Sequence, residues 1–73
     1  MYDFKKTPEL NSADVDVIRA MARCDMDSTK AAQELHYHVG SVKYHIQRIK
    51  RITGLNPRRF FNLQELLRIV GEN

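Results

Sequence analysis

The sequence predicts a small all-α domain of four helices. Apolar residues recur every three or four positions in four separate segments, which is the spacing of helices that bury one face. Residues that stop and restart helices separate the last two segments, where Gly54 precedes Pro57. At 73 residues the chain is long enough for one domain. We expect this domain over residues 11–70, with an N-terminal arm at 1–10 and a tail at 71–73.

The first predicted helix begins at Asn11 or Ser12 and ends at Arg23 or Cys24. Asp14 lies in its first turn, where the helix dipole favours a carboxylate. Cys24 has no neighbouring base or second cysteine, so we expect it to pack as a small apolar residue. Four residues form the stripe that should face the core: Val15, Ile18, Met21 and Ala22.

The next two helices form the segment around which the rest of the chain is arranged. A short helix capped by Ser28 or Thr29 leads into a turn over residues 36–40. Ser41 is expected to cap the following helix, which runs to about Thr53. The short helix carries two small residues that allow another helix to approach closely, Ala31 and Ala32.

The helix after the turn has an apolar back and a basic front. The back is formed by Val42, Ile46, Ile49 and Ile52. Because successive residues are about 100° apart, the opposite face carries Lys43, Tyr44, Gln47 and Arg51, with Arg48 and Lys50 at its edges. Two helices and a tight turn of this kind are typical of a helix-turn-helix, whose second helix enters the major groove of DNA.

The fourth predicted helix starts at Pro57, with Asn56 as its N-cap, and runs to Val70. Gly54 should close the preceding helix in the left-handed conformation. The other helices can cover one face of the fourth helix, formed by Phe60, Leu63, Leu67 and Val70. A chain of this size can hardly cover both sides, so we expect a homodimer interface at the other apolar residues: Phe61, Leu66 and Ile69.

Charge is divided unevenly along the chain. Residues 1–34 contain five Lys or Arg and seven Asp or Glu, a net charge of −2, whereas residues 35–73 contain seven and two, a net charge of +5. No acidic residue occurs between Leu35 and Gln64. A basic surface is typical of proteins that bind polyanions, although a run of charge alone more often marks a solvated helix face.

Other kinds of site lack their usual residue patterns. The three histidines and Cys24 do not have the paired spacing of structural zinc sites, so we expect no metal. No catalytic arrangement is present, so we expect neither enzyme activity nor a cofactor. No apolar run approaches the roughly 20 residues that span a bilayer, and a single cysteine fits a reducing compartment. We expect a soluble protein of the cytoplasm, associated with the nucleoid.

Residues 11–70 resemble the C-terminal helix-turn-helix domain of the purine-catabolism and sugar-diacid regulators, the PucR type, which is related to the Fis-like DNA-binding domains. The matching residues are Thr29, Ala32, Leu35, His38, Ser41, Tyr44 and residues 52–55. Val39, Gly40 and His45 differ from the residues usual in the family, so the resemblance carries no base preference. Family members place this domain after a sensing region, so we expect either a lone DNA-binding unit or a fragment of a longer regulator.

The sequence therefore predicts a bacterial transcriptional regulator that binds double-stranded DNA as a homodimer. Gln47 is placed to read an adenine and Lys43 to read a guanine. The expected DNA contacts are Thr29, His38, Ser41, Lys43, Tyr44, Gln47, Arg48 and Arg51. The alternative is a protein-interaction module that keeps the fold and binds another regulator through its apolar fourth helix.

Overall fold

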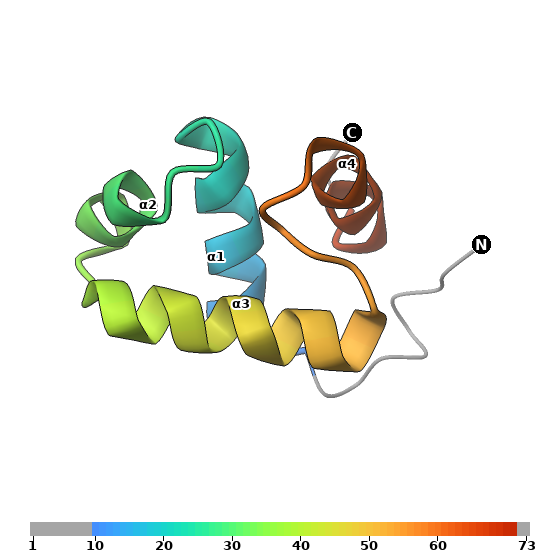
Figure 1. The fold of residues 1–73 in the computed structure, drawn as a ribbon, viewed down its shortest axis with the longest axis horizontal. Coiled ribbons are helices and arrows are strands. Elements are labelled where there is room, and N and C mark those ends of the chain that lie inside the picture. Colours follow the sequence, from blue (N-terminus) through green and yellow to red (C-terminus); the bar gives the residue numbers. More distant parts are fainter. Residues whose placement is uncertain (1–9, 72–73) are drawn as a thin grey trace.

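Four helices form the fold of residues 10–71, the part of the chain that the computed structural model describes (Figure 1). They are α1 (Ser12–Arg23), α2 (Ser28–Leu35), α3 (Val39–Thr53) and α4 (Phe60–Ile69). No strand occurs in residues 10–71, and the predicted all-α domain of four helices is confirmed. The predicted arm lies outside the described residues except for Leu10, which is buried, and so does the predicted tail beyond Gly71.

α1 starts at a reciprocal cap and is covered on several sides. The Asn11 side chain accepts a hydrogen bond from the backbone N–H of Asp14 at 2.9 Å, and Asp14 Oδ2 accepts one from the backbone N–H of Asn11 at 3.1 Å. Because α1 contacts all three other helices, its buried arc is wider than the predicted stripe. The prediction missed Val17 and Ala20, which are buried, and was wrong for Ala22, which is exposed.

α2 begins directly after Asp27, whose carboxylate caps it. Asp27 Oδ1 accepts hydrogen bonds from the backbone N–H groups of Thr29 and Lys30, at 2.9 and 3.2 Å. The prediction of Ser28 or Thr29 as the cap was therefore wrong, because the carboxylate of the preceding residue already accepts hydrogen bonds from the free amide groups of the first turn. The two small residues of α2 are buried, as predicted.

α3 begins earlier than predicted. The chain turns sharply at His36, which has a φ of 59°, and the helix starts at Val39. The carbonyl of His38 accepts hydrogen bonds from the N–H groups of Ser41 and Val42, at 3.0 and 3.2 Å. The prediction of Ser41 as the cap was wrong, because the left-handed residue shortens the turn and leaves Ser41 inside the first turn of the helix.

The end of α3 follows the prediction. Gly54 has a φ of 76°, and its N–H donates to the carbonyl of Lys50 at 2.8 Å. Thr53 Oγ1 donates to the carbonyl of Ile49 at 2.8 Å and accepts from the N–H of Leu55 at 3.0 Å. These bonds fix the direction in which the chain leaves α3.

α4 begins at Phe60, three residues after the predicted start at Pro57. The Asn56 side chain accepts a hydrogen bond from the N–H of Arg58 at 3.0 Å, and its carbonyl accepts one from the N–H of Arg59 at 2.9 Å. The chain thus makes a separate turn before the helix. Asn56 closes this turn and does not cap α4, so the predicted start was wrong.

The buried face of α4 is rotated from the predicted one. Its buried residues are Leu63, Leu66 and Ile69, spaced three apart. This single row faces α1, the helix on which α4 mainly packs. Phe60 and Phe61 are 55% and 79% exposed. The prediction of a covered Phe60 was wrong, and so was the placement of Leu66 and Ile69 on an uncovered dimer face.

The core lies where the four helices meet. In Figure 1, α2 and α4 lie on either side of α1, and α3 runs across them. The buried side chains of α3 are Val42, Ile46 and Ile49, which belong to the predicted back of this helix. With its back fixed in the core, α3 presents the opposite face to solvent.

Candidate DNA interface

The outer face of α3 consists of four exposed side chains: Lys43, Tyr44, Gln47 and Arg51. Their spacing of three and four residues places them in one stripe along the helix. Tyr44 is 58% exposed, and its ring meets the ring of His45 edge to face with the centres 5.3 Å apart. The predicted orientation of this helix is confirmed. Because the stripe lies on a helix, its side chains are positioned more precisely than they would be on a loop.

A second group of predicted contacts lies where α2 and α3 begin. Thr29, His38 and Ser41 are all exposed. The backbone N–H of Thr29 is bonded to Asp27, so its hydroxyl is the group that can meet a ligand. His38 and Ser41 line a hollow of about 340 Å³, with His36, Tyr37 and His45. Hydroxyl and imidazole groups at such a hollow can donate hydrogen bonds to phosphate oxygens.

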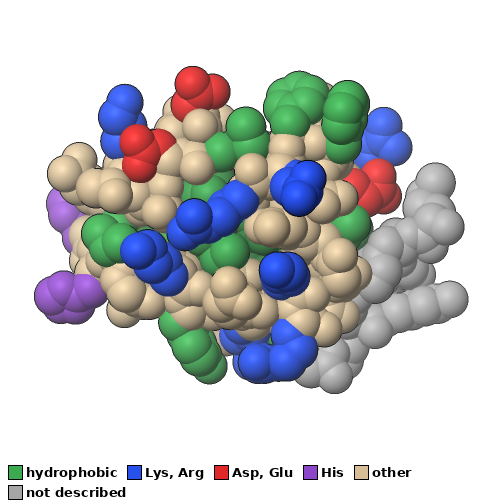
Figure 2. Space-filling view, in the orientation of Figure 1, with side chains coloured by type: hydrophobic (Ala, Val, Ile, Leu, Met, Phe, Trp, Pro, Cys, Tyr) green, Lys and Arg blue, Asp and Glu red, His purple; other side chains and the backbone are tan. Residues whose placement is uncertain are grey.

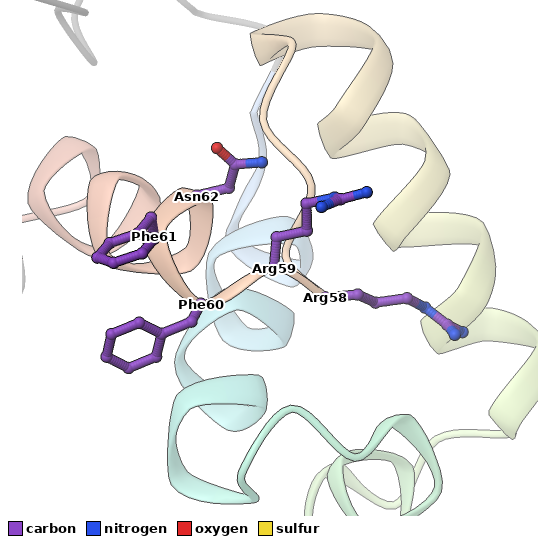
Figure 3. Close-up of a pocket in the computed structure, with 5 residues that line it drawn as sticks. All are labelled: Arg58, Arg59, Phe60, Phe61 and Asn62. Atoms are coloured by element: carbon purple, nitrogen blue, oxygen red, sulfur yellow. The ribbon is translucent and has the colours of Figure 1, made fainter.

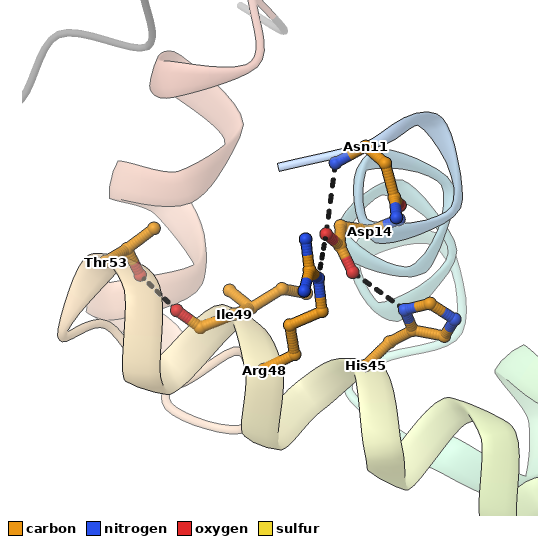
Figure 4. A network of polar contacts seen from close by, with 6 residues as sticks. All are labelled: Asn11, Asp14, His45, Arg48, Ile49 and Thr53. Atoms are coloured by element: carbon orange, nitrogen blue, oxygen red, sulfur yellow. Dashed lines mark hydrogen bonds and ion pairs between the residues drawn. The ribbon is translucent and has the colours of Figure 1, made fainter. Parts of the chain in front are cut away.

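Arg48 is held against α1 by an ion pair with Asp14. Its Nε donates to Asp14 Oδ2 at 2.9 Å (Figure 4). The Asp14 side chain is fully buried, and that of Arg48 is 24% exposed. The hydrogen bond to Asp14 raises the pKa of Arg48 above its ordinary value, so the guanidinium remains charged. Arg48 therefore fastens α3 to α1, a role that its predicted place among the DNA contacts did not include.

His45 binds the other oxygen of the same carboxylate. Its Nδ1 lies 2.7 Å from Asp14 Oδ1, and Nδ1 donates because a carboxylate oxygen accepts (Figure 4). We call Asn11, Asp14, His45 and Arg48 the Asp14 network. Both oxygens of this buried carboxylate are bonded, which offsets the cost of removing it from water. No spacing in the sequence points to the contact, because Asp14 and His45 are 31 residues apart.

Lysine and arginine side chains gather on one face of the molecule. Figure 2 shows them over α3 and over the connection between α3 and α4, whereas acidic side chains lie toward the margins of the view. The exposed cations of these two segments are Lys43, Lys50, Arg51, Arg58 and Arg59. Neither segment contains an acidic residue. The field of this face therefore attracts polyanions.

Cys24 lies at the end of α1 and bonds to α2. Its thiol donates to Glu34 Oε2 at 3.0 Å, and Glu34 also accepts a hydrogen bond from Arg23. The bond to Glu34 raises the pKa of Cys24, while the bonds from Cys24 and Arg23 lower the pKa of Glu34. A raised pKa favours the protonated thiol, which is a poor nucleophile and a poor metal ligand.

In residues 10–71, no group of three or more His, Cys, Asp or Glu side chains could hold a metal ion. None of the helices in this range has the length and apolar composition needed to cross a bilayer.

The PucR C-terminal helix-turn-helix domain is the family whose model matches this chain, over residues 15–68. The match includes part of α1, all of α2 and α3, and most of α4. Neither the curated proteins nor the solved structures contain a significant match. Since the match covers well over half of the 73 residues, the chain belongs to the family of PucR C-terminal helix-turn-helix domains.

Proposed function

We propose that this domain acts in transcriptional regulation by inserting α3 into the major groove of double-stranded DNA. The family supports the general function, because its helix-turn-helix belongs to DNA-binding regulators. The outer face of α3 is the observation that carries the more specific proposal. It is exposed, polar and basic, and the back of the helix is fixed in the core. The major groove, about 12 Å wide, admits a helix held in this way.

Different side chains of the outer face suit different parts of the duplex. Gln47 has an amide that can bind both hydrogen-bonding atoms of an adenine edge, and Lys43 can donate to a guanine. Tyr44 can pack on a thymine methyl group or donate to a phosphate. Arg51 is a phosphate contact, and so are the exposed polar residues at the helix starts: Thr29, His38 and Ser41.

Arg48 acts in this proposal as a positioning residue. Because its Nε is bonded to Asp14, it sets the placement of α3 on α1, and through that the placement of the outer face. Such a role affects DNA binding indirectly, through the orientation of the helix that meets the groove.

A second copy of this chain is the partner that we propose for the exposed phenylalanines. The rings of Phe60 and Phe61 meet edge to face with their centres 5.3 Å apart, and both are largely exposed. Helix-turn-helix dimers bind half-sites about 34 Å apart. The domain measures 31 × 20 × 17 Å, so two copies fit beside each other along one turn of DNA. Leu66 and Ile69, which lie in the core, are not part of this interface.

Selection of bound sequences from random duplexes tests the proposed function. Wild-type protein should enrich a motif, and Gln47→Ala should change the preference at one base pair by about 1–3 kcal/mol. Gln64→Ala is the matched control, because Gln64 is an exposed glutamine of α4, and its motif should equal that of the wild type. Failure of the wild type to enrich any motif would contradict sequence-specific binding. An unchanged motif with Gln47→Ala would remove Gln47 from the residues that read bases.

The exposed phenylalanines also favour a second candidate function, a module that binds another regulator through α4. In that case Phe61→Glu would abolish binding of the partner, and substitutions on the outer face of α3 would have no effect on it. The basic face over α3 favours DNA, because a surface that binds only protein does not require it. DNA binding needs neither a catalytic group nor a cofactor, and we place the protein at the nucleoid in the cytoplasm.

A further inference from the structure

The connection between α3 and α4 carries two exposed arginines beyond the outer face of α3. They are Arg58 and Arg59, which we call the connector arginines. The ion pairs among residues 10–71 involve other basic residues. No carboxylate in the described part of the chain therefore forms an ion pair with either connector arginine. An exposed guanidinium without a carboxylate partner is available to an anion from another molecule.

The connector arginines point toward α3, whereas the phenylalanines that follow them point away from it. Figure 3 shows the side chains of Arg58 and Arg59 on the side where α3 lies, and those of Phe60 and Phe61 on the opposite side. These four residues and Asn62 line a hollow of about 510 Å³. One short stretch of chain therefore presents cations beside α3 and aromatic rings on another surface.

The backbone of the connector arginines is fixed relative to α3. Asn56 accepts hydrogen bonds from the N–H groups of both arginines, and Pro57 is buried. At the other end of the connection, the left-handed Gly54 and the bonds of Thr53 set the exit from the helix. The two charges are thus carried by an ordered turn, so little backbone freedom is lost when they bind a ligand.

We propose that the connector arginines contact the phosphate backbone of the duplex whose major groove receives α3. This inference rests on the proposed function. Phosphates line both edges of a major groove, so a cation beside the inserted helix meets phosphate and not a base edge. A guanidinium suits this contact, because two parallel N–H groups can bind two phosphate oxygens.

The position of the arginines favours DNA over an acidic protein as their partner. Figure 2 shows Lys and Arg side chains both over α3 and over the connection that follows it. The exposed Lys43 and Lys50 belong to α3, and the connector arginines extend this positive charge onto the connection. A ligand that follows this surface must carry negative charge along its length, as a nucleic-acid backbone does. The contacts would strengthen binding to all base sequences and help to fix the orientation of α3 on the duplex.

Salt dependence of duplex binding tests the inference. Affinity for a random-sequence duplex is measured by fluorescence anisotropy over a range of salt concentrations, for the wild type and for Arg58→Gln, Arg59→Gln, Arg51→Gln and Arg68→Gln. Each variant removes one positive charge. Arg68 is the control, because its side chain is 73% exposed and belongs to α4, outside α3 and the connection between α3 and α4. Thermal unfolding of each variant shows that the fold is retained.

Arg58→Gln and Arg59→Gln should each weaken binding and flatten the log–log salt dependence by about 0.9. The loss relative to wild type should therefore shrink about 3.5-fold between about 50 mM and about 200 mM salt. Arg68→Gln should leave the slope unchanged.

The other outcomes separate the inference from the proposed function. If Arg51→Gln flattens the slope while both connector variants behave like Arg68→Gln, the inference is overturned and the proposed function stands. If Arg68→Gln flattens the slope equally, the effect is one of net charge, and the inference is overturned. If the connector variants change self-association and leave the salt dependence of duplex binding unchanged, the arginines belong to a protein interface and the inference is overturned. A wild type that does not bind duplex overturns both proposals.

Discussion

The buried carboxylate of Asp14 in α1 accepts a hydrogen bond at 2.9 Å from Nε of Arg48, 34 residues later in α3. Asp14 also accepts bonds from the cap of α1 and from His45. One side chain thus completes the start of α1 and sets how α3 lies upon it. Since the outer face of α3 is the proposed DNA-binding surface, this carboxylate links the stability of the domain to the placement of its binding residues.

Asp14→Asn should destabilise the domain by about 2–4 kcal/mol, because the new amide N–H₂ would face a donor and the charge of Arg48 would lose its partner. Urea unfolding followed by circular dichroism measures the loss. Asp16→Asn is the matched control, since Asp16 is an exposed aspartate of the same helix, and its stability should stay within about 0.5 kcal/mol of wild type. Equal stability of the two variants would show that the Asp14 network does not hold α3 on α1.

Arg48→Ala should lower the stability of the domain, whereas Arg51→Ala should weaken DNA binding. Arg48→Ala should lower the urea midpoint, because Asp14 loses one of its bonded partners. Arg51→Ala should leave the midpoint unchanged, weaken binding to all duplexes and flatten the log–log salt slope by about one. The two variants are compared by unfolding and by anisotropy at several salt concentrations. The assigned roles would be contradicted if Arg48→Ala kept wild-type stability while flattening the slope as much as Arg51→Ala.

Phe61→Glu should yield a folded monomer, whereas Ile69→Glu should unfold the domain. Phe61 is 79% exposed and Ile69 is 6% exposed, so only the second substitution places a carboxylate in the core. Analytical ultracentrifugation at micromolar concentration measures the mass of each protein, and circular dichroism measures helicity. Gln64→Glu is the control for added charge on α4. A wild type that sediments as a monomer would contradict the proposed dimer.

The faces of α3 could be predicted because they depend only on helical period. Val42, Ile46 and Ile49 recur at helical spacing, and one buried row fixes where every other side chain of a long helix points. The end of the helix at Gly54 was equally predictable, because a left-handed residue at this position favours glycine over any residue with a side chain.

Helix starts and the rotation of α4 depend on interactions that spacing does not reveal. Asp27 caps α2 although Ser28 and Thr29 also have suitable side chains. Oxygens of several neighbouring side chains can reach the same backbone amides, so spacing alone does not identify the cap. Leu66 and Ile69 face inward because of how α4 docks on α1. The Asp14 network joins residues more than 30 positions apart in sequence, so only the folded chain brings it together.

The central claim is that the outer face of α3 is the surface that meets DNA. Titration of ¹⁵N-labelled protein with a short duplex of random sequence, followed by NMR, tests this claim residue by residue. The largest amide shifts should fall on Lys43, Tyr44, Gln47 and Arg51, with smaller shifts at the start of α2, while Gln64 and Arg68 of α4 remain nearly unchanged. Shifts confined to α4, or no shifts as duplex is added, would contradict the claim.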